Sequence, residues 1–217
     1  MKAWRGFTLL ELLIVIAIIG LLTLLLVSVM HSVRLRSYKT TCINQLRQLG
    51  TGILLYREDY GELPQAQVLA LPYVRQKQLY LCPADPFAPL PGASFHGYYW
   101  ATIYGHTMGV SYSYVRERMY PEEFERLRNA DPNFGILVCA LHDRCNWEGK
   151  QPPLVEATVS CLDHILRLRI DLSVQWVRVP MRYFTCTDDG ALTMARDPWR
   201  LMSDIPCPAD ICDNTGR

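Results

Sequence analysis

The sequence predicts an α+β protein in which one long N-terminal helix packs on an antiparallel β-sheet. Residues 7–33 form an almost unbroken apolar run, and residues 34–61 continue it with apolar side chains every three or four positions, a pattern typical of a helix with one buried face. Residues 165–170 and 174–179 alternate apolar and polar side chains on either side of a short break, which is typical of a β-hairpin.

The first half of the helix, residues 7–33, is long enough to cross a membrane, because at about 1.5 Å per residue it exceeds the roughly 30 Å hydrocarbon core of a bilayer. Lys2 and Arg5 precede it, so we expect a single pass with a cytoplasmic N-terminus and an exported C-terminal part. Glu11 is the only ionisable side chain between positions 7 and 30. Because a carboxylate in hydrocarbon costs about 2.5–3.5 kcal/mol, we expect Glu11 to have a partner.

The second half of the helix, residues 34–61, is predicted to be amphipathic and to lie against the exported domain. Its apolar stripe consists of Leu35, Tyr38, Cys42, Leu46, Leu49, Ile53, Tyr56 and Tyr60. Gly50 and Gly52 each weaken a helix by about 1 kcal/mol relative to alanine, which favours a bend. Gly61, with Pro64 shortly after it, predicts the end of the helix.

Residues 62–217 are predicted to form one exported α+β domain with disulfides. Proline, glycine and aromatic residues are frequent over 83–120, which favours loops and short strands over helices, with one strand near 111–115. A short helix is predicted at Pro121–Ala130 and a buried strand at Gly135–Cys139, ahead of the hairpin.

All eight cysteines lie on the exported side of the apolar run, where disulfides persist. Besides Cys42 and Cys82, the candidate disulfide cysteines are Cys139, Cys145, Cys161, Cys186, Cys207 and Cys212. Their connectivity stays open, because eight cysteines allow many pairings.

Two groups of residues have features of metal sites. Cys139-x-x-His142-x-x-Cys145, followed by Cys161-x-x-His164, has the spacing of zinc ligands. Asp188 and Asp189 begin an Asp-Asp-Gly string that is similar to an acidic calcium loop, although it lacks the spaced ligands of an EF-hand. In an oxidising compartment disulfides and a solvated turn are favoured, so the sequence predicts no bound metal, with a structural zinc or calcium ion as the alternative.

Composition and motifs give no reason to expect an enzyme or a nucleic-acid partner. The formal net charge is +1, from 22 basic and 21 acidic residues. The chain has no Gly-x-Ser-x-Gly, no His-Glu-x-x-His and no glycine-rich phosphate loop, so we expect no catalytic residues.

The start of the apolar run resembles a known signature. Residues 6–11, Gly-Phe-Thr-Leu-Leu-Glu, followed by a long aliphatic stretch, resemble the prepilin signature of type IV pilins and type II secretion pseudopilins. The resemblance implies that a prepilin peptidase removes residues 1–6 by cutting after Gly6 and that Phe7 is then N-methylated. It also implies that Glu11 aligns subunits in a filament by meeting the N-terminal amine of a neighbour, and that the protein has a type IV pilin-like fold.

A second resemblance covers residues 42–50 (CINQLRQLG), 56–61 (YREDYG) and 82–85 (CPAD). These strings are similar to a bacterial branch of prepilin-type proteins. The resemblance implies a Cys42–Cys82 disulfide that clamps the chain back onto the helix, and a C-terminal hairpin with Asp-Gly at its turn. Leu172 stands where that glycine is usual, so the turn type stays open.

These features predict a structural subunit, major or minor, of a type IV pilus or a type II secretion pseudopilus. Its expected partners are the prepilin peptidase, other pilin subunits and an inner-membrane assembly platform, and its expected location is the bacterial inner membrane, with the exported domain in the periplasm or in an extracellular filament. One alternative is a membrane-tethered binding or adhesion module that uses the prepilin export route. The other is an exported protein that depends on a metal held by the Cys/His group.

Overall fold

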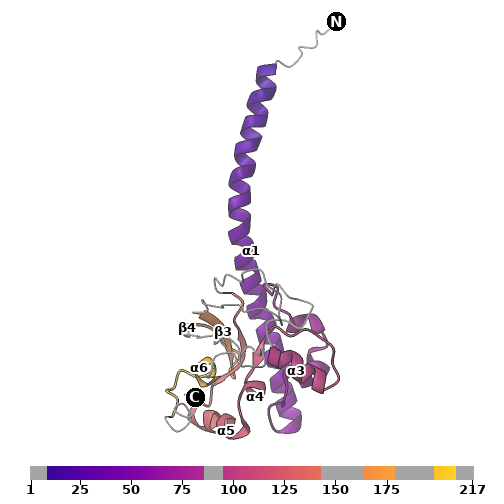
Figure 1. Ribbon diagram of the computed structural model, residues 1–217, viewed down its shortest axis with the longest axis vertical. Coiled ribbons are helices and arrows are strands. Elements are labelled where there is room, and N and C mark those ends of the chain that lie inside the picture. Colours follow the sequence, from indigo (N-terminus) through magenta and orange to yellow (C-terminus); the bar gives the residue numbers. More distant parts are fainter. Residues whose placement is uncertain (1–8, 86–94, 143–163, 179–197, 209–217) are drawn as a thin grey trace, which may run out of the picture. The chain divides into compact units, whose positions relative to one another are not determined.

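The computed structural model describes residues 9–85, 95–142, 164–178 and 198–208 (Figure 1). The described elements, in chain order, are α1 (Leu9–Tyr60), η1 (Gln67–Ala70), α2 (Leu71–Val74), η2 (Lys77–Tyr80), α3 (Phe95–Ile103), β1 (Ser113–Tyr114), α4 (Val115–Arg118), α5 (Pro121–Ala130), β2 (Gly135–Cys139), β3 (His164–Arg169), β4 (Val174–Arg178) and α6 (Pro198–Met202). The chain divides between Tyr38 and Lys39 into two compact units. An apolar N-terminal helix followed by shorter helices and an antiparallel sheet makes this the expected α+β, pilin-like fold.

The first unit is the N-terminal part of α1. Leu9–Leu26 has a mean hydropathy of 3.0 over 18 residues, and none of these residues is buried in the structure. The segment is therefore long and apolar enough to cross a membrane, as the sequence predicts.

In the second unit, α1 buries the centre of its predicted stripe. Cys42, Leu46, Leu49 and Ile53 are each at most 1% exposed. The end of the stripe is different, because Tyr60 is exposed and stacks on Tyr56 with 4.3 Å between the ring centroids. The amphipathic pattern therefore identifies the buried face correctly in the middle of the segment, and not at its end.

The end of α1 is where the sequence predicts it. Gly61 has φ +78°, and its N–H donates to the carbonyl of Arg57 at 2.8 Å, which is the left-handed cap that glycine favours. The two earlier glycines have a packing role: a β-carbon on Gly50 would lie 2.4 Å from Leu168 Cδ2, and one on Gly52 would lie 2.3 Å from Val74 Cγ2. Both positions let a neighbouring side chain reach the helix backbone.

Within the described residues the sheet has four strands in the order β1-β2-β3-β4, all antiparallel. The predicted buried strand is β2, and the predicted hairpin is β3–β4, in which Leu166 pairs with Trp176. Leu172, at the hairpin turn, has φ 64°, a conformation that costs a non-glycine residue about 1–2 kcal/mol. Its side chain reaches the space beside Gly50, so contact with α1 offsets part of this cost.

The prediction of loops and short strands over residues 83–120 is only partly correct. β1 confirms the strand, but α3 and α4 are helices. The aromatic side chains that favoured extended structure pack along one helix instead, with Trp100 stacked on Tyr104 at 6.1 Å and in edge contact with Tyr99. α3 also packs against η1, α4 and β1, and such tertiary contacts override the local propensity.

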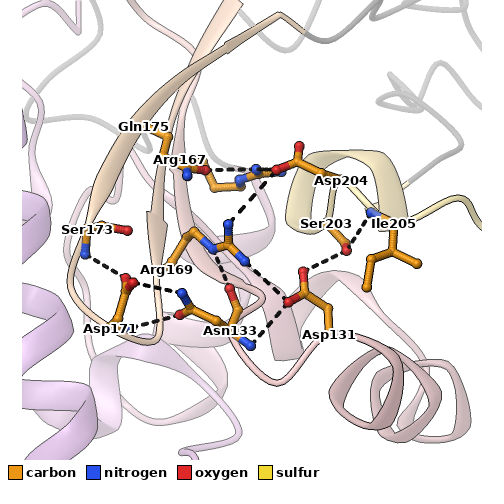
Figure 2. Close-up of polar contacts among 10 residues, drawn as sticks. All are labelled: Asp131, Asn133, Arg167, Arg169, Asp171, Ser173, Gln175, Ser203, Asp204 and Ile205. Atoms are coloured by element: carbon orange, nitrogen blue, oxygen red, sulfur yellow. Dashed lines mark hydrogen bonds and ion pairs between the residues drawn. The ribbon is translucent and has the colours of Figure 1, made fainter.

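A polar network fixes the hairpin to the elements around it (Figure 2). Asp131, which ends α5, accepts hydrogen bonds from Ser203 Oγ at 2.7 Å and from Arg169 at 3.3 Å. Asn133 donates to Asp171 at 2.7 Å. α5, the hairpin turn and the end of α6 are thereby linked through side chains that lie far apart in the sequence.

Arg167 is the most buried member of this network. Its side chain is 1% exposed, and its NH2 group donates to Asp204 Oδ2 at 2.7 Å and to Gln175 Oε1 at 2.9 Å. Its Nε and Nη1 atoms are buried without a hydrogen-bond partner among the described residues. The buried charge of Arg167 therefore depends strongly on the Asp204 carboxylate for compensation.

Candidate functional site

The described start of α1 carries one carboxylate among exposed aliphatic side chains. Leu9 and Leu10 precede Glu11, Leu12 and Leu13 follow it, and all five are exposed, the leucines by 53–81%. Gly6 and Phe7, the predicted processing residues, lie outside the described residues. What the structure adds is that Glu11 shares the helix surface with the apolar side chains.

An apolar surface of this length requires a non-aqueous environment. Burying apolar area is worth about 25 cal/mol per Å², so a helix with eighteen exposed, mostly aliphatic residues is strongly driven into lipid or against other apolar helices. As a helix it already satisfies its backbone hydrogen bonds, which a hydrocarbon environment demands. This part of the chain is therefore suited to membrane anchoring and to helix–helix packing.

A second constellation lies inside the second unit and joins three segments. Cys42 belongs to α1, Cys82 follows η2, Cys139 ends β2, and His142 comes three residues later. Their ligand atoms all lie within 4.8 Å of one another, and Cys82 Sγ is 3.2 Å from His142 Nε2. The three cysteines are buried and the histidine is half-buried. We call these four residues the Cys/His cluster.

Polar contacts hold the Cys82 segment in place. In the Cys-Pro-Ala-Asp turn, the N–H of Asp85 donates to the Cys82 carbonyl at 2.9 Å. The buried Asp85 carboxylate accepts a hydrogen bond from Ser111 Oγ at 2.6 Å. The neighbouring Tyr112 donates its hydroxyl to Gln45 Oε1 on α1 at 2.9 Å. The turn and α1 are thus both tied to the segment that leads into β1.

The Cys42–Cys82 disulfide implied by resemblance is not formed in the structure, where both residues and Cys139 carry free thiols. The physical difference is the third sulfur, because the Cys139 Sγ atom lies within 4.8 Å of both the Cys42 and the Cys82 sulfurs. The Cys139 and Cys42 side chains, and then His142, lower the pKa of Cys82 below its usual value, although burial acts in the opposite direction. Burial, and then the neighbouring Cys42 and Cys82, raise the pKa of Cys139.

The other predicted cysteine and metal residues fall elsewhere. Cys207 is disulfide-bonded. His164 does not join Cys139 and His142, because its ring stacks on Trp176 with 5.3 Å between centroids. The remaining candidates, Cys145, Cys161, Cys186, Cys212, Asp188 and Asp189, lie outside the described residues. The Cys139-x-x-His142 spacing was the sequence signal for the cluster, but the sequence did not connect it with Cys42 and Cys82.

Fold and site together define a membrane-anchored α+β protein whose apolar helix remains available for packing. Residues 1–27 match the family model described as the prokaryotic N-terminal methylation motif, so the chain carries the signature of the type IV pilin and pseudopilin family. That family is structural rather than catalytic, and its signature implies processing by a prepilin peptidase and assembly with other pilins. Neither a comparison with curated proteins nor one with solved structures found a match.

Proposed function

We propose that this protein is a structural subunit, major or minor, of a type IV pilus or a type II secretion pseudopilus. In this proposal the chain is cleaved after Gly6, methylated on Phe7, and held in the inner membrane with its second unit exported until it enters a filament. The observation that carries the proposal is the exposed apolar helix with its one carboxylate, Glu11, inside the methylation motif.

The physical role of Glu11 follows from its surroundings. In a filament core made of such helices, the carboxylate would be surrounded by aliphatic side chains, where a lone charge is costly. Cleavage after Gly6 creates a positive N-terminal amine on Phe7, four positions before Glu11 in the sequence, and each subunit therefore carries both charges. Pairing the carboxylate of one subunit with the amine of the next neutralises both and fixes their axial register.

The experiment compares Glu11→Leu with a matched control, Thr23→Leu. Both introduce leucine for a polar residue in the same apolar helix, but Thr23 donates its hydroxyl to Gly20 O of its own helix at 2.9 Å. We expect both variants to insert and to be cleaved. The measured quantity is the ratio of sheared filament subunit to membrane-resident subunit at equal expression.

For Glu11→Leu this ratio should fall at least about tenfold, which corresponds to about 1.4 kcal/mol per added subunit, while Thr23→Leu stays close to wild type. A Glu11→Leu variant that assembles like the wild type would argue against a role of Glu11 in assembly. It would leave the protein as a membrane-tethered module.

A binding or adhesion module is the second candidate, and one observation favours it. Tyr99 and Tyr104 on and after α3 are 52% and 37% exposed, and both contact Trp100. Exposed aromatic groups of this kind are common in binding surfaces. If they bind a partner, Tyr99→Ala with Tyr104→Ala should abolish adhesion and leave the filament ratio unchanged.

A further inference from the structure

The Cys/His cluster contains three cysteines, whereas the Cys42–Cys82 disulfide implied by the resemblance would use only two of them. A disulfide joins two sulfurs at about 2.05 Å and gives no role to a third thiol or to an imidazole. In the structure Cys42, Cys82 and Cys139 are all thiols, and the His142 ring nitrogen lies 3.2 Å from the Cys82 sulfur. The arrangement is therefore a set of four side chains whose metal-ligand atoms lie close to one another.

Its dimensions fit a tetrahedral metal. Zinc–sulfur bonds of about 2.3 Å and zinc–nitrogen bonds of about 2.0 Å place the ligand atoms of a tetrahedral site with three sulfurs and one nitrogen about 3.5–3.8 Å apart. The cluster's four ligand atoms lie within 4.8 Å of one another, so only small side-chain movements separate it from that geometry. Three thiolates and one imidazole form a soft donor set, and tetrahedral sulfur and nitrogen ligation is typical of structural zinc.

We propose that Cys42, Cys82, Cys139 and His142 bind one structural zinc ion. Binding replaces the thiol protons, which pass to solvent, and leaves no coordination position open for catalysis. The site differs from the group that the sequence suggested, because it takes two ligands from that group and two from α1 and the Cys-Pro-Ala-Asp turn. The inference does not depend on the filament role and would hold for a tethered module as well.

The position of the cluster means that a bound ion would link separate segments of the fold. One zinc would join α1, the turn after η2 and the end of β2, whereas a Cys42–Cys82 disulfide would leave β2 unattached. Coordination would also keep three buried thiols from oxidising in an oxidising compartment, since zinc itself is not redox-active.

The test uses the full-length chain, extracted from membranes without chelators and with free thiols blocked by alkylation after denaturation. Zinc is measured by elemental analysis, and affinity by competition with a zinc chelator. We expect about one zinc per chain and all three cysteines alkylated. His142→Asn and Cys139→Ser should each weaken zinc affinity more than about 100-fold, because loss of a direct ligand exceeds the 10–100-fold typical of outer-shell changes.

The matched control is His106→Asn, the same change at a half-buried histidine outside the cluster, which should leave zinc binding unchanged. His142→Asn is the decisive variant, because a disulfide between Cys42 and Cys82 would not respond to it. Recovery of a Cys42–Cys82 disulfide without zinc would overturn the proposal. So would zinc that survives both ligand variants, or a different metal in its place.

Discussion

Leu168 Cδ2 fills the space that Gly50 leaves open beside α1, at 2.4 Å from where a β-carbon on that glycine would stand. Leu168 is fully buried in β3, so it has little room to move. At Gly52, two residues along the same helix, the corresponding neighbour is Val74, which is only half-buried at the end of α2. The same substitution should therefore have different consequences at the two glycines.

We expect Gly50→Ala to lower the free energy of unfolding. Overpacking costs about 1–3 kcal/mol, and the gain of about 1 kcal/mol in helix propensity offsets only part of it. Gly52→Ala should be closer to neutral, because Val74 can shift. Denaturant unfolding of the two variants in the same detergent measures the difference. Adding Leu168→Ala should remove most of the penalty of Gly50→Ala, and a simple sum of the two single effects would contradict the contact.

A second prediction concerns Glu117, a carboxyl group buried beneath the segment that leads into η1. It is 6% exposed and accepts hydrogen bonds from the Gln67 N–H at 3.0 Å and from Gln67 Nε2 at 3.2 Å. Burial raises its pKa from the ordinary 4.5 to about 7, although the Gln67 contacts act in the opposite direction. Between these two pH values the folded chain holds a proton that the unfolded chain has released.

This contribution to stability is complete below about pH 4.5 and is lost as the pH rises through about 7, with a total on the order of 3 kcal/mol. Urea unfolding at intervals from pH 5 to 8 should show the decline in the wild type and a flatter profile in Glu117→Gln. The control is Glu122→Gln, on the exposed side of α5, which should keep the wild-type slope. An unchanged slope in Glu117→Gln would assign the pH dependence to another group.

A third prediction concerns the buried charge of Arg167. Asp204→Asn leaves its guanidinium without a compensating carboxylate at 2.7 Å and should cost about 1.5–3 kcal/mol. Arg167→Met removes the charge but keeps the length of the side chain, so combining it with Asp204→Asn should restore part of the loss. Glu125→Gln, in a surface pair with Arg128, serves as the control and should change stability by less than about 1 kcal/mol. Thermal unfolding of the two single variants, the double variant and the control measures whether their stabilities follow this order.

A fourth prediction concerns processing. If Gly6 is the cleavage residue, mass spectrometry of protein from membranes should find a chain that begins with N-methylated Phe7. Replacing Gly6 with a bulky residue should retain the leader without changing the fold of the second unit. Intact Met1 on wild-type protein, in cells with an active peptidase, would contradict this assignment.

The sequence correctly predicted those helices and strands that are specified by patterns within a few neighbouring residues. The hairpin, α5, β2 and the end of α1 at Gly61 follow from alternation, a helix-starting proline and a glycine cap, all of which act over a few residues. α3 was missed, because its aromatic side chains favour strands until their packing along a helix is known.

The contacts that were missed join distant segments. Nothing near Gly50 in the sequence points to Leu168, and nothing near Cys42 points to Cys139. Sequence spacing assigns these cysteines to two separate groups, a disulfide pair and a set with zinc-ligand spacing, whereas folding brings members of both into one cluster. Sequence spacing alone cannot reveal such a set, since each ligand comes from a different element.

The continuity of α1 has a consequence for the order of folding. Synthesis completes this helix first, yet its buried face finds its partners in β2 and β3, near the other end of the chain. Val74, which follows soon after the helix, can cover Gly52 early, whereas the space beside Gly50 is filled only when Leu168 and Leu172 of the hairpin arrive. Contacts this distant in sequence slow folding, and we expect the closing of β3 over Gly50 to be the late, rate-limiting step. A chain truncated before the hairpin should therefore expose this face and aggregate.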